Sequence, residues 1–98
     1  MDLSQLTKEM HRFVEAKGWY DTQTPKPQTA RNLATSLVIE VTEVLELYQW
    51  SDEHAHDDLL AGELADVALY LLQLASISGI DLERAILQKL EENYKRDW

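Results

Sequence analysis

The sequence predicts an all-α protein whose four helices form one bundle, with residues 1–98 as a single domain. Two observations predict this class. Apolar residues recur at the 3.6-residue spacing of amphipathic helices, and no segment shows the strict alternation of a half-buried strand. Gly and Pro are scarce, with three and two residues, and most of them stand between the periodic segments, where helices would end.

The size of the chain favours an oligomer. With 98 residues, 45% of them hydrophobic, a single copy buries about 60 to 65% of the surface that the unfolded chain exposes. Small chains often complete their core through another subunit. We therefore expect a homo-oligomer, either a dimer or a tetramer.

The first expected helix covers about residues 3–17 and is followed by a loop. Asp2 and Gln5 suit a capping box at its start, and Gly18 suits its end. Its apolar face consists of Leu3, Leu6, Met10, Phe13 and Val14. Two prolines make residues 19–28 a loop, and the Trp and Tyr that this loop displays make it a candidate for ligand contacts.

Three more helices are expected after this loop. One covers about residues 30–49 behind Thr29 as N-cap. Polar residues 51–57 connect it to the next helix, which covers about residues 58–78 and ends before Gly79. The last begins at Asp81, a good N-cap, and runs to about Tyr94. Its apolar residues are expected to face the core: Leu82, Ala85, Ile86 and Leu90.

Charge and composition disfavour several partners. A formal net charge of -9 argues against binding a nucleic acid polymer. The apolar run at residues 59–80 is long enough to span a bilayer, but Glu63 and Asp66 within it would each cost roughly 2.5 to 3.5 kcal/mol at the membrane centre. The chain has no Cys, and its first residues lack a basic segment followed by an apolar one. We expect a cytoplasmic protein that does not enter a membrane.

Two acidic motifs interrupt the most apolar helices. Glu40 and Glu43 form Glu-x-x-Glu on the second helix, and Glu63 and Asp66 form Glu-x-x-Asp on the third. Residues three apart share a helix face, and antiparallel helices would bring the two motifs opposite each other. The acidic face of the third helix continues with two further polar residues, Tyr70 and Gln73.

Four converging acids require compensation. Raised pKa values would relieve their repulsion, but divalent cations relieve it better, and all-oxygen ligands select Mg²⁺ or Mn²⁺ over zinc. Iron is disfavoured because iron sites in helical bundles use paired Glu-x-x-His motifs. The single such string, Glu53 to His56, lies in the polar connection, where His54 and His56 are expected to be solvated. For Glu40 and Glu43 alone, a solvated helix face is the plain alternative.

These residues resemble a known family. The segments "LVIEVTEVLELYQW" and "ELADVALYLLQLA" are similar to the MazG-type all-α nucleoside triphosphate pyrophosphohydrolases, which share Glu-x-x-Glu, a variable spacer and Glu-x-x-Asp. The similarity extends to "KGW" after the first helix and to "QKLEENYKR" near the end. The "RNL" and "QW" features are closest to the short members related to dCTP pyrophosphatases.

The resemblance implies a reaction and a metal site. A nucleoside triphosphate would be hydrolysed between its α and β phosphates, giving the monophosphate and pyrophosphate. The substrate would be dCTP or another deoxynucleotide that the cell needs to remove. Mg²⁺ would be held by Glu40, Glu43, Glu63 and Asp66, and the first two would also assist the attacking water. Many members carry another Glu immediately before the first motif. Ile39 occupies that position here, so the identity of the general base stays open.

The resemblance also implies substrate contacts. Trp19, Gln28 and Trp50, which ends the second helix, would surround the base, and Tyr70 would reach the substrate from the acidic face. Residues on one face of the last helix would meet the phosphates: Lys89, Asn93 and Arg96. Ordinary core packing is the alternative for each aromatic residue, and a solvated basic face that complements the helix dipole is the alternative for the last three.

Two other functions remain open at this stage. One is a related activity, such as dUTP or phosphoribosyl-ATP pyrophosphohydrolysis. The other is a non-catalytic helical assembly module, in which the acids pair with basic residues of another chain.

Overall fold

The computed structural model describes residues 1–53 and 56–97 and confirms the all-α class. Four helices follow one another: α1 (Leu3–Ala16), α2 (Ala30–Glu46), α3 (Asp57–Ile77) and α4 (Leu82–Lys95). No strand occurs within these described ranges. His54, which we expected to be solvated, lies outside them.

Local capping fixes where three of the helices begin. Asp2 and Gln5 form the expected capping box, with Gln5 N donating to Asp2 Oδ1 at 2.8 Å and Asp2 N donating to Gln5 Oε1 at 2.9 Å. Thr29 Oγ1 accepts from Asn32 N, and Asp81 Oδ1 accepts from Arg84 N. These side chains satisfy backbone donors that a helix start leaves without partners.

The prediction that α2 continues to Gln49 is wrong. The helix ends at Glu46, and the chain tightens into successive turns in which Tyr48 N donates to Leu45 O and Gln49 N to Glu46 O. Hydrogen bonds between residues three apart, as in a 3₁₀-helix, are common at the C-terminal end of an α-helix. Trp50 therefore lies beyond α2, and 90% of its surface is exposed.

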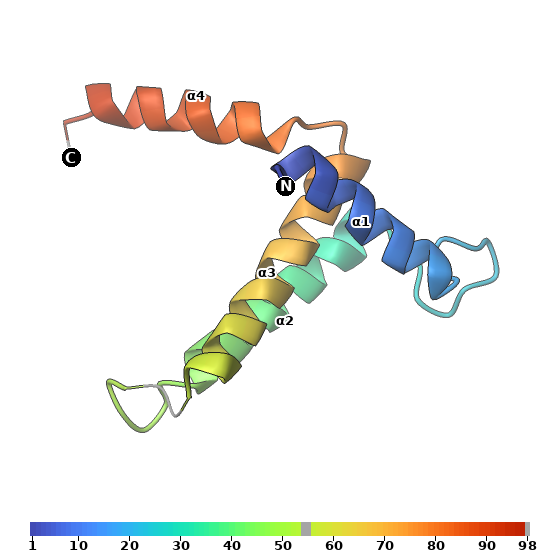
Figure 1. Cartoon of the computed structure of the whole chain (residues 1–98), viewed down its shortest axis with the longest axis horizontal. Helices are drawn as coiled ribbons and strands as arrows, with labels where there is room; N and C mark the ends of the chain where they lie inside the picture. The colour runs from blue at the N-terminus through green and yellow to red at the C-terminus, as the bar shows by residue number, and fades with distance from the viewer. Residues whose placement is uncertain (54–55, 98) are drawn as a thin grey trace.

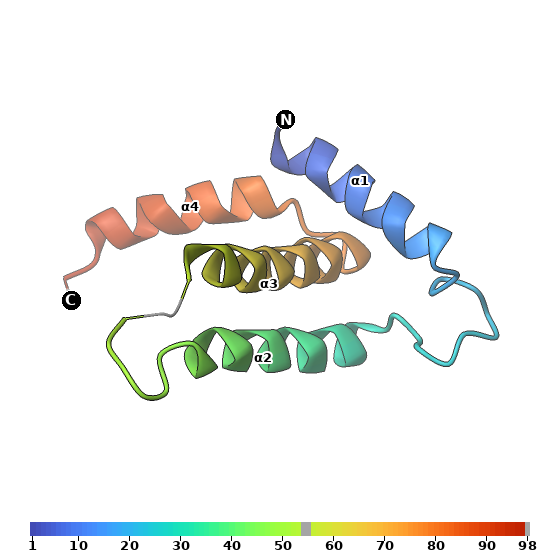
Figure 2. The ribbon, with the colours of Figure 1, turned by 60° about the horizontal axis from the view of Figure 1, so that its bottom comes forward.

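The helices form a paired body with one diverging arm. α2 and α3 lie side by side and antiparallel (Figures 1 and 2), as the motif spacing predicted, and they make the most extensive contact between any two helices. α1 crosses the C-terminal half of α3. α4 leaves the C-terminal end of α3 and diverges from the pair (Figure 1).

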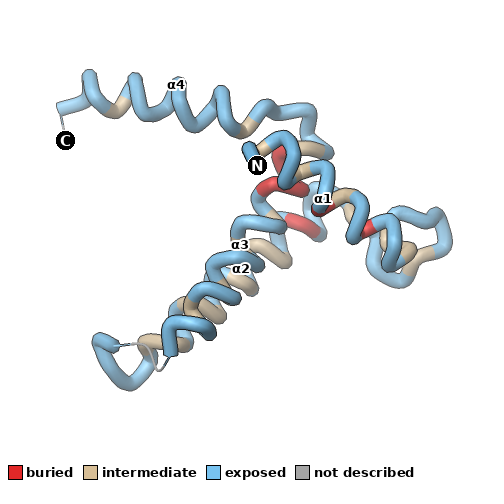
Figure 3. Tube along the Cα trace, viewed as in Figure 1, coloured by how far each residue is buried: buried red, intermediate tan, exposed pale blue. Residues whose placement is uncertain are grey.

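The core lies where α1, the start of α2 and the end of α3 meet (Figure 3). Its buried residues are Met10, Val14, Leu33, Leu72, Gln73 and Ala75. On α1, two members of the predicted apolar face, Met10 and Val14, are buried, whereas Leu6 and Phe13 are 41% and 49% exposed. The buried polar residue in this set, Gln73, lies on the face of α3 that also carries the acids.

The prediction that α4 turns its apolar residues inward is wrong within one chain. α4 has no buried residue; Ile86 and Leu90 are 43% and 50% exposed, Ala85 is exposed, and Leu82 is half-buried. The apolar periodicity predicted the helix correctly. However, α4 diverges from α3, and no described element covers the apolar face of α4.

α3 is long and apolar enough to cross a membrane by length and composition. In the structure it lies along α2, and Glu63 near its start approaches two acids of α2. The same helix therefore carries an acidic end and an end packed into the core.

Candidate metal centre and adjoining pocket

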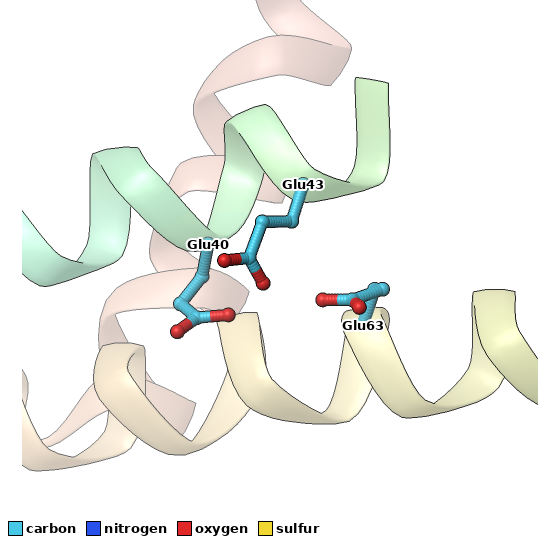
Figure 4. Close-up of side chains that lie close together, drawn as sticks. All are labelled: Glu40, Glu43 and Glu63. Atoms are coloured by element: carbon cyan, nitrogen blue, oxygen red, sulfur yellow. The ribbon is translucent and has the colours of Figure 1, made fainter. Parts of the chain in front are cut away.

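Three of the four predicted acids converge between α2 and α3. Glu40 and Glu43 come from successive turns of α2, and Glu63 comes from the facing side of α3 (Figure 4). One carboxylate oxygen from each lies within 4.8 Å of the other two. Because the helices are antiparallel, residues far apart in the sequence meet at one level of the pair.

Asp66 lies one turn further along α3 and does not join this group of three. Its side chain is exposed. Its negative charge still contributes to raising the pKa of both Glu40 and Glu63. The structure therefore places Asp66 beside the cluster, as an additional acid at its edge.

The electrostatics of the cluster disfavour full ionisation. The pKa of Glu40 is raised, first by desolvation and then by its hydrogen-bonding and charge interactions with Glu43. The pKa of Glu63 is raised first by hydrogen bonding with Glu43, then by burial and by neighbouring acids. Two carboxylates can share a hydrogen bond only when one of them holds a proton. Close negative charges add to both pKa shifts.

The donor set fits a hard divalent cation. Glu40 Oε2 and Glu63 Oε2 are fully buried and have no hydrogen-bond partner among the described residues. None of the ion pairs found there involves a member of the cluster. Converging carboxylate oxygens without N or S donors match the ligands that Mg²⁺ and Mn²⁺ take. An ion would supply the partners that these buried oxygens lack.

A pocket of about 440 Å³ adjoins the acids. Its walls come from α1, the following loop, α2 and α3, and they include Glu40 and Asp66 as well as three predicted substrate contacts: Trp19, Gln28 and Tyr70. Apolar α1 side chains, including Met10 and Phe13, form another wall. An apolar pocket with a few convergent polar groups is typical of a small-molecule site.

Neighbouring side chains hold Trp19 at the pocket. The Phe13 ring packs edge-on against it at a centroid distance of 5.6 Å. The Lys26 ammonium lies over the Trp19 ring, 5.0 Å from its centroid. Such contacts fix the orientation of an aromatic ring. Trp50, by contrast, does not line this pocket.

The predicted phosphate contacts on α4 lie apart from the acids within one chain. Lys89, Asn93 and Arg96 do not line the pocket beside the acids. Lys89 Nζ lies 3.5 Å from Glu92 Oε2 in an exposed pair. Asn93 Oδ1 is fully buried and has no hydrogen-bond partner in residues 1–53 and 56–97. Because α4 diverges from α3, a single chain does not bring this face to the carboxylates.

Sequence reasoning missed a polar network at the other end of the pocket. Gln73 Nε2 donates to Gln28 Oε1 at 2.8 Å and to the Tyr20 hydroxyl at 3.3 Å. That hydroxyl lies 2.6 Å from His11 Nδ1, and His11 Nε2 lies 2.7 Å from Ser76 Oγ. The polar spacing of the sequence had placed Gln73 on the acidic face of α3, but not its hydrogen-bond partners. No local pattern links His11 to Ser76, 65 residues away.

The fold and site define an all-α protein with a carboxylate cluster suited to a divalent cation and a small-molecule pocket beside it. Comparison with known proteins agrees. The model of the MazG-like family matches residues 35–97, a range that contains all four acids. The chain belongs to the MazG-like family.

Two curated relatives and one solved structure show how far the similarity extends. Rat dCTP pyrophosphatase 1 is 33% identical over 86% of this chain and 52% of its own length. The dATP/dGTP diphosphohydrolase of cyanophage S-2L is 32% identical over 87% of this chain and 72% of its own. A pyrophosphatase from Archaeoglobus fulgidus has a TM-score of 0.80 and 31% identity, covering 94% of this chain and 88% of its own. The chain thus spans about half the length of the mammalian dCTP pyrophosphatases that it matches.

Proposed function

We propose that this protein is a Mg²⁺-dependent nucleoside triphosphate pyrophosphohydrolase that converts a deoxynucleoside triphosphate and water into the monophosphate and pyrophosphate. The observation that carries the proposal is the convergence of Glu40, Glu43 and Glu63 beside a pocket that also reaches Asp66. The names of the relatives, a dCTP pyrophosphatase and a dATP/dGTP diphosphohydrolase, support a nucleotide substrate.

The acids would serve the reaction by holding the cation. Glu40, Glu43 and Glu63 supply the ligands, and Asp66 contributes from the edge of the cluster. A bound Mg²⁺ or Mn²⁺ would neutralise charge on phosphate oxygens and lower the pKa of water. Water adds to phosphorus at the α–β anhydride, and the bridging oxygen departs with the leaving phosphate group. With Ile39 preceding the first motif, Glu40 or Glu43 is the residue available to accept the proton of the water.

The pocket would hold the base and sugar. Trp19 offers a ring fixed by Phe13 and Lys26, and base stacking on an aromatic ring is worth about 1 to 3 kcal/mol for any base. Gln28 and Tyr70 line the same space. Stacking alone does not select a base, so cytosine and purine nucleotides both remain within reach of this site.

We also propose that the active form is a homo-oligomer, a dimer or a tetramer. α4 exposes a continuous apolar face in which Ile86, Leu87 and Leu90 are 43%, 61% and 50% exposed. Val38 and Leu45 of α2 are 66% and 69% exposed. Large apolar patches mark protein contacts. A second subunit on these faces would also provide a route for α4 residues of one chain, Lys89, Asn93 and Arg96, to approach the phosphates bound by another.

The proposed substrate and composition also suggest where the protein acts. Nucleoside triphosphates are the substrates, and neither a membrane nor a nucleic acid polymer is required. We propose a cytoplasmic enzyme that removes unwanted deoxynucleotides. Glu63 of α3 lies close to two acids of α2. This arrangement suits a metal site in a water-soluble protein better than a membrane-spanning helix.

A panel of triphosphates assayed for pyrophosphate tests the proposal. We expect pyrophosphate release with at least one of dCTP, dUTP, dATP and dGTP, and its loss with a chelator and in Glu63→Ala. Glu83→Gln, on α4, is the matched control and should retain activity. Release of inorganic phosphate alone, or activity unchanged in Glu63→Ala, would overturn the proposal.

Thermal unfolding separates this enzyme from a non-catalytic assembly module. A ligand that binds only the folded state stabilises it by about 2.7 kcal/mol at 100 times its Kd. For a chain of this length that is roughly a 10 to 20 °C rise in Tm. We expect Mg²⁺ to produce such a rise, whereas acids that serve only to pair with another chain would leave the Tm unchanged by Mg²⁺.

A further inference from the structure

One end of the pocket fixes how the Gln73 side-chain amide is oriented. The backbone carbonyl of Lys26 can only accept, so the Gln28 atom that meets it at 2.7 Å is the amide nitrogen Nε2. Gln28 therefore turns Oε1 toward Gln73 and accepts from Gln73 Nε2 at 2.8 Å. Turning over the Gln73 amide would place two carbonyl oxygens against each other, because neither can donate.

Tyr20 uses the second hydrogen on the same nitrogen. Its hydroxyl accepts from Gln73 Nε2 at 3.3 Å, and His11 and Ser76 hold that hydroxyl from behind. A primary amide nitrogen carries two hydrogens. Gln28 and Tyr20 therefore use the whole donor capacity of Gln73.

The carbonyl oxygen Oε1 is the remaining hydrogen-bonding group of the Gln73 side chain. Gln73 is only 3% exposed and lines the 440 Å³ pocket. Among the hydrogen bonds of residues 1–53 and 56–97, none has Gln73 Oε1 as its acceptor. Gln73 Oε1 is not one of the fully buried oxygens that lack a partner among the described residues, so a donor of a ligand in the pocket can reach it. Gln73 thus presents an acceptor to the pocket. The surrounding hydrogen bonds prevent the amide from turning over and presenting a donor there instead.

This acceptor lies at a suitable separation from the acids. Seven residues separate Asp66 from Gln73 on α3, or about 10 Å along the helix axis. Both residues line the same pocket. A nucleotide whose phosphates lie at the carboxylates would extend its base toward Gln73.

We infer that Gln73 is a specificity-determining residue that selects nucleotides whose base carries an exocyclic amino group over those with a carbonyl at the same position. The amino group of cytosine or adenine would donate to Gln73 Oε1. The carbonyl of uracil or hypoxanthine would instead face another carbonyl. Gln28, Tyr20 and His11 are positioning residues that keep the amide from turning. The inference rests on the proposed function, because it assigns the base preference of that same site.

Pairs of substrates that differ in this one group provide the test. The ratio of kcat/KM for dCTP to that for dUTP, and for dATP to that for dITP, is measured in the intact protein. We expect Gln73→Met, which keeps the side-chain length, to lower the dCTP to dUTP ratio about tenfold or more. Tyr20→Phe frees one amide hydrogen and should lower it about threefold. Gln88→Met and Tyr94→Phe, both on exposed α4 positions, are the matched controls and should keep the parental ratio.

Binding of the monophosphates separates this inference from the proposed function. Titration calorimetry with dCMP and dUMP, without metal, reads base preference in the absence of hydrolysis. If the parent releases no pyrophosphate from any triphosphate, the proposed function fails, and the dCMP to dUMP affinity ratio still decides the role of Gln73. A parent that prefers neither member of each pair, or a Gln73→Met ratio within twofold of the parent, would overturn the inference. If Gln73→Met does not fold, the ratio in Tyr20→Phe decides.

Discussion

Helices α3 and α4 are consecutive and both carry apolar faces, yet only α3 is part of the core. α3 packs against α1 and α2 and buries Leu72, Gln73 and Ala75. α4 buries no residue and diverges after a short connection. An amphipathic pattern thus specifies that a helix forms and which of its faces needs cover, but it does not specify what provides the cover.

The comparison extends to polar groups. At its core end, α3 presents Gln73 and Ser76, and side chains of the same chain hydrogen-bond to both. At its acidic end, Glu63 keeps a buried oxygen for which the described part of the chain provides no hydrogen-bond partner. The amide hydrogens of Gln73 find acceptors within the chain, the carboxylates suit an ion, and the apolar face of α4 suits another subunit. Three variants test these assignments separately.

The largest effect is expected at the acidic end. Glu43→Gln keeps the shape of the central acid but removes its charge, so a proposed metal ligand is lost while the repulsion that contributes to raising the pKa of Glu40 and Glu63 is relieved. Losing a group that merely orients a ligand costs 10 to 100-fold. We therefore expect pyrophosphate release to fall by about 100-fold or more, together with a higher Tm for the metal-free protein.

Opposite changes in activity and stability would identify the cluster as a ligand site. Both are measured on the same preparation, by pyrophosphate assay and by thermal unfolding in chelator. Glu83→Gln removes a charge from the first turn of α4; it should leave pyrophosphate release unchanged and should not raise the Tm, because an acid at that position favours the helix. A Tm that falls in Glu43→Gln would show that its carboxylate stabilises the metal-free fold, contrary to this assignment.

A smaller effect is expected on α4. Leu90 lies on the apolar face with Ile86 and is 50% exposed in one chain. If another subunit covers this face, Leu90→Asp would bury a charge without a partner and dissociate the oligomer. The mass measured by light scattering should then fall to that of one chain. Gln88→Asp places the same charge on the opposite side of α4 and should leave the mass unchanged. An unaltered mass in Leu90→Asp would show that α4 is not the interface.

The sequence predicted structure best where it depends on contacts between residues close together in the chain. The capping residues Asp2, Thr29 and Asp81 act within three residues, and these helix starts were predicted correctly. The convergence of Glu40 with Glu63 was also predictable, because antiparallel neighbours pair at a spacing that the connection fixes. The course of α4 was not, since its periodicity is the same whether its own chain or another covers it.

The network behind the pocket marks the other limit. Gln73 shares a face with the acids, so its position could be predicted, but its orientation depends on Gln28 in a loop and on Tyr20 beyond α1. Loop geometry with two prolines follows from backbone details that side-chain spacing does not carry. The sequence therefore identified the residues lining the site more readily than the polarity that they present.

The smallest effect is expected where the chain already meets its own requirements. Tyr20→Phe removes a hydroxyl that lies between His11 and Gln73, at 2.6 and 3.3 Å. The ring itself is retained and is 36% exposed, so water can reach part of the network after the change. A hydrogen bond of this kind contributes about 1 kcal/mol to the free energy of unfolding. We expect the Tm to fall by roughly 4 to 8 °C, whereas Tyr94→Phe, at a position 90% exposed, should leave it unchanged.

Because Tyr20 lies away from the carboxylates, the Mg²⁺-induced rise in Tm should persist in Tyr20→Phe. Its loss would mean that the two ends of α3 are coupled, and that the network at the core end also shapes the acidic end.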